Sequence, residues 1–282
     1  MTVLLGTSVA KAPTLLVFDS GLGGLTVYRE VAKARPDASL VYVADDAFFP
    51  YGSHAEAELA ARVVELMGAL IAACRPDLVV IACNTASTLV LPQLRAHFAV
   101  PFVGTVPAIK PACAASRSKR VSVLGTQATV AREYTRALVR DFANGTDVTL
   151  VGSAELAPLA EAELRGETVA DAAIARELAP CFVEARGRRT DTVVLACTHF
   201  PLLIDRFTRL APWPVDFIDP APAIARRVIE LIGGPEAEDA RAQARIVFTS
   251  GKVPSPAMAA RLAGFGISEI TSGLFDTPPL SA

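Results

Sequence analysis

The 282-residue sequence lacks several features that would identify its class at once. It has no long run of one charge, and its net charge is only −2, so nothing points to nucleic acid or an anionic membrane surface as a partner. Its apolar stretches are interrupted by charge well before the roughly 18 residues that a membrane span needs, and the first thirteen residues lack the pattern of a secretory signal. We therefore expect a loose tail at the start of a cytoplasmic protein that acts on a small molecule, with no membrane partner.

Signals for a bound metal or cofactor are also missing. The five cysteines are odd in number and form no C-x-x-C pair, which fits neither a disulfide framework nor a zinc site. The stretch D-S-G-L-G-G-L, residues 19–25, lacks the last glycine of G-x-G-x-x-G, and no G-x-x-x-x-G-K-[ST] loop occurs. Lys110 lies at a predicted helix start, away from the polar strand ends, which disfavours a pyridoxal Schiff base. We expect reduced thiols, no metal and no cofactor.

What the sequence does contain is an alternation of apolar strands with amphipathic helices along nearly the whole chain. Over half of the residues are apolar, enough for a large core. The alternation predicts an α/β fold with mostly parallel sheets covered by helices on both faces. We expect two similar α/β domains, one formed by residues 1–107 and 217–282 and the other by residues 108–216. The patterns also predict single helices over 129–142 and 168–186, with the arginines from Arg186 to Arg189 at the solvated end of the second.

Two stretches far apart in the chain are nearly the same. DLVVIACNTAS, residues 77–87, and DTVVLACTHFP, residues 191–201, each place a cysteine where a buried strand gives way to a helix. Such a position can lower the pKa of a thiol. Polar residues also follow other predicted strands, at Asp19-Ser20 and Thr126, on the side of a parallel sheet where ligands bind. Cys83 and Cys197 are therefore candidate reactive residues, whereas Cys74, Cys113 and Cys181 fit the pattern of small buried side chains.

Paired thiols favour proton transfer at a carbon atom over acyl transfer. Cys197 with His199 could serve as nucleophile and base in acyl transfer, but this leaves Cys83 without a role. Two thiols on opposite faces of a planar carbanion can instead remove a proton from one face and return one to the other. Such a site must exclude water and stabilise the developing enolate with hydrogen bonds.

The sequence resembles the glutamate racemases, cofactor-independent enzymes that supply D-glutamate for bacterial peptidoglycan. The matching segments lie in order along the chain: VFDSGLGGLTV (17–27), PYG (50–52), VIACNTAS (80–87), GTVPAIKPA (104–112), LGTQATV (124–130) and LACTHFPLL (195–203). C-N-T-A-S and C-T-H-x-P-L-L at this separation are highly specific. The resemblance implies two α/β domains related by an approximate twofold axis, with glutamate between them.

Residue roles follow from the same resemblance. It implies that Cys83 and Cys197 are the catalytic acid/base residues, that Asp19 assists the first thiol, and that His199, with Glu161, assists the second. The implied substrate-binding residues are Asp19, Ser20, Tyr51, Gly52, Asn84, Thr85, Thr126, Thr129, Thr198 and His199.

Other functions stay open at this point. An aspartate or hydantoin racemase of the same superfamily would also use paired cysteines. A Cys-dependent amidohydrolase would use Cys197 and His199, and a two-lobed binding module for an acidic metabolite would need neither thiol. The sequence leaves open whether the chain forms a homodimer.

Overall fold

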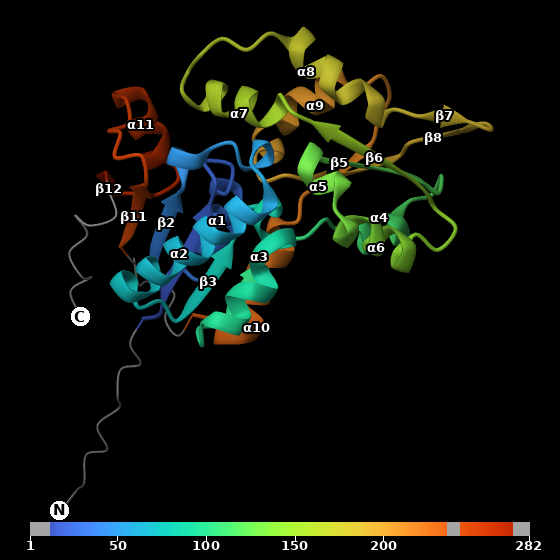
Figure 1. Ribbon diagram of the computed structural model, residues 1–282. Coiled ribbons are helices and arrows are strands. Elements are labelled where there is room, and N and C mark those ends of the chain that lie inside the picture. Colours follow the sequence, from blue (N-terminus) through green and yellow to red (C-terminus); the bar gives the residue numbers. More distant parts are fainter. Residues whose placement is uncertain (1–11, 236–242, 273–282) are drawn as a thin grey trace, which may run out of the picture.

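The first half of the molecule is built on a six-stranded sheet. A computed structural model of the chain describes residues 12–235 and 243–272, so most of the expected N-terminal tail lies outside the described residues. The strand order is β12-β11-β2-β1-β3-β4, and all neighbouring strands are parallel (Figure 1). The strands are β1 (Thr14–Asp19), β2 (Ser39–Ala44), β3 (Leu78–Ile81), β4 (Phe102–Gly104), β11 (Ala244–Phe248) and β12 (Glu269–Ser272).

Alternating side chains of this sheet supply two separate cores. In β1, Leu15 and Val17 belong to one apolar cluster, and Leu16 and Phe18 belong to the other, as the two-residue period of a strand requires. The first cluster also contains residues of α1 (Leu25–Ala34), α10 (Ala221–Ile232) and α11 (Pro256–Gly264). The second contains residues of α2 (Glu56–Cys74) and α3 (Asn84–His97). Helices therefore cover both faces of the sheet.

The second half is built on a smaller parallel sheet with the order β10-β9-β5-β6. Its strands are β5 (Arg120–Thr126), β6 (Asp147–Ser153), β9 (Thr192–Ala196) and β10 (Asp216–Ile218). One apolar cluster joins this sheet to α7 (Leu156–Leu164), α8 (Asp171–Leu178) and α9 (Ile204–Leu210). The other joins it to α4 (Ile109–Ala115) and α6 (Glu133–Phe142). The prediction of an α/β fold with parallel sheets is confirmed.

Two helix predictions in this half are wrong in detail. The helix expected over 168–186 is limited to α8, and the chain continues as the short 3₁₀ helix η3 (Ala179–Cys181). The arginine-rich segment is not a helix end: β7 (Glu184–Ala185) and β8 (Arg188–Arg189) form an antiparallel hairpin. Its turn places Arg186 and Gly187 at φ values of 55° and 70°, a conformation that a glycine favours and a helix excludes. The hairpin projects from the second half in Figure 1.

The helix expected over 129–142 is interrupted at Arg132. This residue has an extended backbone, with φ −70° and ψ 143°, and separates α5 (Gln127–Ala131) from α6. Hydrophobic periodicity does not reveal such a break, because the residues on both sides still follow a helical pattern. The sequence patterns also predicted no element for the segments that form α7, β11, α11 and β12.

The chain crosses between the sheets twice. It leaves the six-stranded sheet after β4, and returns from β10 to α10, which packs against the first sheet. The domain boundaries at 107/108 and 216/217, and the twofold relation between the halves, stay predictions. Within the described ranges, no helix is both long enough and apolar enough to cross a membrane.

Candidate active site

A small cavity lies where the carboxyl ends of the two sheets meet. The residues that line it come from the segments that follow β1, β2, β3 and β9, from the start of α3, from the end of β5 and from α7: Ser20, Phe49, Pro50, Tyr51, Gly52, Cys83, Asn84, Thr85, Thr126, Ala157, Cys197, Thr198 and His199. Its volume is about 20 Å³, which is room for about one water molecule. Both candidate cysteines therefore face the same small space, although they follow strands of different sheets.

The first thiol lies at the N-terminus of α3. Cys83 is the residue before this helix, and its Sγ lies 3.7 Å from Ser20 Oγ. Burial raises the pKa of the thiol, and the nearby charge of Asp19 raises it further, against smaller opposing hydrogen bonds. In this structure Cys83 is therefore held as a protonated thiol.

Asp19 is completely buried behind this thiol. Its Oδ2 accepts a 2.6 Å hydrogen bond from the Gly24 amide, and Thr198 Oγ1 lies 3.5 Å from its Oδ1. Gly24 permits this approach because a Cβ there would lie 2.8 Å from Asp19 Cβ. Burial raises the pKa of the carboxyl above its usual value, although the His199 charge and the backbone amides act in the opposite direction. Asp19 is therefore a better proton acceptor than an ordinary aspartate.

The second thiol is linked to a buried ion pair. Cys197 Sγ lies 3.8 Å from His199 Nδ1, and His199 Nε2 lies 2.9 Å from Glu161 Oε1. The same oxygen accepts a 2.6 Å hydrogen bond from the Leu22 amide. These contacts join α7 and the loop after β9 to the glycine-rich loop after β1.

The charges of His199 and Glu161 are set by the contacts that these side chains make. For His199, burial lowers the pKa, but hydrogen bonds to Cys197 and Glu161 outweigh it and hold the pKa well above its usual range. For Glu161, burial raises the pKa, but the His199 contacts and the Leu22 amide outweigh it and lower the pKa. An imidazolium and a carboxylate therefore stand beside Cys197.

Hydroxyl groups gather on the Cys83 side of the cavity. Thr85 Oγ1 lies 3.1 Å from Thr126 Oγ1 and 3.3 Å from Thr129 Oγ1. Thr126 also caps α5 by accepting a hydrogen bond from the Thr129 amide at 3.1 Å. We call Thr85, Thr126 and Thr129 the hydroxyl cluster. Such groups can donate hydrogen bonds to a carboxylate.

Asn84 is a buried residue of the cavity whose side-chain amide is unpaired. It is only 2% exposed, yet neither its Oδ1 nor its Nδ2 has a hydrogen-bond partner in the described structure. A buried polar atom left unpaired costs about 1–3 kcal/mol. A ligand that fills the cavity and pairs with this amide would remove that cost.

The Tyr51 hydroxyl is hydrogen-bonded to a residue that does not line the cavity. It donates a 2.6 Å hydrogen bond to Asp45 Oδ2, and Arg62 and Thr249 also bind this carboxylate. Tyr51 therefore offers the cavity its ring and backbone rather than its hydroxyl. Sequence reasoning missed Asp45 and Arg62; the only signal was a pair of aspartates directly after β2.

All the residues implied by the resemblance lie at this one site. Asp19, Glu161 and Thr129 do not line the cavity but contact residues that do. Within the residues that the structure describes, no group of three or more His, Cys, Asp or Glu side chains is arranged to hold a metal ion.

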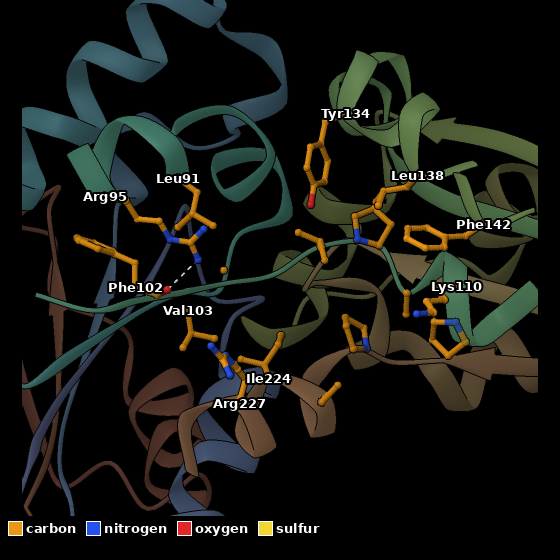
Figure 2. Close-up of a pocket in the computed structure, with 17 residues that line it drawn as sticks. Leu91, Arg95, Phe102, Val103, Lys110, Tyr134, Leu138, Phe142, Ile224 and Arg227 are labelled. Carbon is orange, nitrogen blue, oxygen red and sulfur yellow. Dashed lines mark hydrogen bonds between the residues drawn. The ribbon is translucent and has the colours of Figure 1, made fainter. Parts of the chain in front are cut away.

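A larger groove of about 500 Å³ lies along the two crossovers between the sheets (Figure 2). Arg95, Lys110 and Arg227 give it a basic lining, and Tyr134 faces it from α6. Lys110 Nζ lies 5.3 Å from the centre of the Phe142 ring, and Arg227 pairs with Glu230 at 2.8 Å. The groove combines apolar walls with cationic groups.

Comparisons with known proteins agree with this geometry. A family model described as Asp/Glu/Hydantoin racemase matches residues 22–228. The glutamate racemase of Brucella anthropi is 54% identical over 255 residues, which cover 90% of this chain and 92% of that protein. The glutamate racemase of Brucella canis is 51% identical over 262 residues, with coverages of 92% and 95%.

A solved structure also resembles this chain along most of its length. The crystal structure of Escherichia coli glutamate racemase, in complex with L-glutamate and the activator UDP-MurNAc-ala, matches with a TM-score of 0.83 and 41% identity. The match covers 92% of this chain and 97% of that one.

Proposed function

Because the chain belongs to the Asp/Glu/hydantoin racemase family and has the function of a glutamate racemase, we propose that Cys83 and Cys197 are its two proton-transfer residues. The observation that carries this proposal is that both thiols face one cavity from different halves, each with its own buried carboxylate behind it. The reaction interconverts L- and D-glutamate, and its D-glutamate serves peptidoglycan synthesis. The enzyme is an isomerase.

The proposed reaction starts from glutamate placed with its α-carbon between the two sulfurs. One thiolate removes the α-proton, and the electron pair spreads onto the α-carboxylate as an enediolate. The other thiol then returns a proton to the opposite face, which inverts the configuration. Asn84 and the hydroxyl cluster lie next to Cys83 and can donate hydrogen bonds to the carboxylate attached to that carbon.

The ionisation of the site suits this sequence of steps. The His199 imidazolium stands beside Cys197, while burial and the Asp19 charge raise the pKa of Cys83, so Cys83 holds its proton. In one direction, Cys197 therefore removes the proton and Cys83 supplies one. The opposite direction needs the Cys83 thiolate, and Asp19 can accept its proton because burial raises the pKa of that carboxyl.

The experiment that tests the proposal follows the α-proton. The protein is incubated with L-glutamate in deuterium oxide, and both deuterium at the α-carbon and optical rotation are recorded for the wild type, Cys83→Ser and Cys197→Ser. We expect deuterated D-glutamate from the wild type and severe loss of racemisation in each variant. Ordinary turnover by either variant alone would contradict the two-thiol proposal.

We further propose that the basic groove binds an acidic nucleotide sugar that regulates the enzyme. The E. coli relative was solved with the activator UDP-MurNAc-ala, which carries a diphosphate. Arginine and lysine side chains are the usual partners of such groups, and the groove places Arg95, Lys110 and Arg227 at the crossovers that join the two halves. A ligand there could change how the halves sit around the cavity.

This second proposal predicts that UDP-MurNAc-ala raises kcat of the wild type. Changing Lys110 and Arg227 together to glutamine should weaken that activation at least tenfold in ligand concentration, while activity without the ligand is retained. Lys33→Gln, a change of an exposed lysine on α1, is the matched control. Equal activation of all three proteins would remove the groove as the regulatory site. A cytoplasmic location stays a prediction, and sedimentation in solution would decide whether the chain forms a homodimer.

A further inference from the structure

Tyr42 is a tyrosine of β2 whose hydroxyl group contacts the loop after β1. The residue is completely buried and does not line the cavity. Its hydroxyl donates a 2.8 Å hydrogen bond to the Gly21 carbonyl. Asp19 Oδ2 lies farther from the hydroxyl, at 3.5 Å, and already accepts the Gly24 amide at 2.6 Å. The hydroxyl proton is therefore directed to the Gly21 carbonyl.

The Gly21 carbonyl belongs to the same peptide group as the Leu22 amide. That amide donates a 2.6 Å hydrogen bond to Glu161 Oε1. The peptide between Gly21 and Leu22 is trans, and a trans peptide directs its carbonyl and its N–H to opposite sides of one plane. A single planar unit therefore joins the Tyr42 hydroxyl on one side to the Glu161 carboxylate on the other.

The contacts continue from Glu161 to the second thiol. The same Glu161 oxygen lies 2.9 Å from His199 Nε2, and His199 Nδ1 lies 3.8 Å from Cys197 Sγ. Tyr42 lies in the six-stranded sheet, whereas Glu161 lies on α7, which packs against the four-stranded sheet. A side chain of the first half is thus hydrogen-bonded, through one peptide group, to the ion pair that stands beside Cys197.

The peptide group needs such a partner because Gly21 is a glycine. A Cβ at this position would clash with Glu161 Oε1, so a glycine is required for the carboxylate to approach the loop this closely. A glycine, however, restricts its own backbone angles less than any other residue. The Tyr42 hydroxyl supplies the restraint that Gly21 lacks, and it fixes the plane in which the Leu22 amide points to Glu161.

The bond from Tyr42 also strengthens the Leu22 amide as a donor, because linked hydrogen bonds polarise one another by roughly 10–30% per bond. Burial raises the pKa of Glu161, and the His199 contacts and the Leu22 amide outweigh it. Burial lowers the pKa of His199, and hydrogen bonds to Cys197 and Glu161 outweigh it. Burial holds the pKa of Tyr42 well above its usual range, so its hydroxyl keeps its proton and stays a donor.

From these contacts we infer that Tyr42 is a positioning residue for racemisation, which holds Glu161 as a carboxylate against His199 through the Gly21–Leu22 peptide group. This inference deepens the proposed function and rests on it. Tyr42 does not line the cavity, so its effect on the reaction passes through the charge of His199, the group that stands beside Cys197.

The direct test follows the charge of His199 rather than turnover. The chain has three histidines, so protein labelled with nitrogen-15 histidine gives three imidazoles in an NMR titration, and His54→Gln and His97→Gln identify the signal of His199. We expect titration from pH 5 to 10 to give a lower pKa for His199 in Tyr42→Phe than in the wild type, because the Glu161 carboxylate is held less firmly. The same pKa in both proteins would overturn the inference.

Tyr28→Phe is the matched control. Tyr28 is 1% exposed, and its ring packs edge-on against Tyr42 with the ring centroids 6.0 Å apart, so the same atom is removed from a neighbouring buried ring. Within the described structure, its hydroxyl makes no hydrogen bond to the loop after β1. We expect the titration of His199 in Tyr28→Phe to match the wild type. An equal shift in both variants would contradict a specific role for the Tyr42 hydroxyl.

Kinetics show whether the effect reaches the reaction. Rates are measured with both enantiomers, and kcat is expressed per folded molecule by using thermal melts followed by circular dichroism. We expect kcat of Tyr42→Phe to fall roughly 2- to 10-fold, the range that one net hydrogen bond represents, and the alkaline limb of the pH–rate profile to move to lower pH. An unchanged alkaline limb would contradict an action through His199.

A double variant shows whether Tyr42 acts through Glu161. Added to Glu161→Gln, the Tyr42→Phe change should lower kcat by less than about twofold, because residues of one hydrogen-bond network are not additive. The full loss of the single variant, repeated in the Glu161→Gln protein, would overturn the inference. Absence of D-glutamate from the wild type would instead contradict the proposed function, and the titration of His199, which needs no turnover, would still decide whether Tyr42 acts on the ion pair.

Discussion

His199 and Glu161 hold opposite charges in a place where neither would be charged alone. The raised pKa of His199 contributes stability that is fully present below about pH 6.5 and is lost as the pH rises through its folded-state pKa. The lowered pKa of Glu161 contributes stability that is fully present above about pH 4.5 and is lost as the pH falls through its folded-state pKa. The pair therefore stabilises the fold most between these two values.

Replacement of Glu161 by Gln should change both activity and its pH dependence. Without the carboxylate, the pKa of His199 loses one of the two partners that raise it against burial, so the imidazolium beside Cys197 is lost at a lower pH. We expect kcat to fall roughly 10- to 100-fold and the alkaline limb of the pH–rate profile to move to lower pH. A profile measured from pH 5 to 10 would show this, with Glu163→Gln, a change of a partly exposed residue on the same helix, as the control. An unchanged alkaline limb would mean that Glu161 does not set the charge of His199.

Residues of the site differ in how far the sequence could predict them. Cys83, Cys197 and His199 follow apolar strands directly, so the rule that ligands bind beyond the carboxyl ends of parallel strands was enough to single them out. Glu161 has no such local signal, because it reaches His199 from a helix 38 residues earlier.

At the scale of elements, parallel strands were predicted more reliably than the segments that join them. A short, continuous apolar run such as Leu78–Ile81 is typical of a strand buried on both faces of a parallel sheet, and all four of its residues are buried. The segment from 168 to 189 was misread because its alanines and arginines are compatible with a helix, whereas the glycine at 187 allows the hairpin turn that forms instead. Local composition does not decide between a helix and a hairpin in this segment, whereas tertiary contacts do.

The loop between β2 and α2 is held in place by one buried carboxylate. Asp45 is completely buried and accepts hydrogen bonds from Tyr51, Arg62 and Thr249, which belong to three different segments of the chain. Phe49 to Gly52 of this loop form one wall of the active-site cavity. The geometry of that wall therefore depends on the charge at Asp45.

Replacement of Asp45 by Asn should loosen this wall. The change removes the charge that accepts hydrogen bonds from the partly exposed Arg62 and from the Tyr51 hydroxyl, and should lower the free energy of unfolding by about 2 kcal/mol, the size of a hydrogen bond to a charged group. We expect KM for glutamate to rise more than kcat falls, because the wall positions substrate rather than the transferred proton. Urea denaturation and steady-state kinetics would measure the two effects. Thr249→Val removes the hydroxyl that donates to Asp45 and accepts from the Ala47 amide but keeps the carboxylate and its bonds to Arg62 and Tyr51. It should lower the unfolding free energy by only about 1 kcal/mol, and equal effects of the two changes would contradict a special role for the charge.

At the scale of the whole molecule, the closed cavity implies motion. Glutamate has about ten non-hydrogen atoms, so it needs several times the space of the one water molecule that a cavity of about 20 Å³ can hold. Because the lining comes from strands of both sheets, the space is created most simply when the two halves move apart. Closure then excludes water from the thiolate and the enediolate.

A reversible cross-link between the halves would test whether this opening is required. A Cβ built on Gly52 would lie 3.6 Å from Thr126 Cβ, within the Cβ–Cβ range of a disulfide. The double change Gly52→Cys with Thr126→Cys should therefore form a disulfide under oxidation, as peptide mass analysis can verify. We expect the oxidised protein to lose nearly all turnover and glutamate binding, and a reductant to restore the activity of the reduced double variant. Each single change serves as a control, because neither can join the halves through this pair. If the oxidised, cross-linked protein still racemises glutamate at the reduced rate, substrate enters without separation of these two segments, and the closed cavity must open elsewhere.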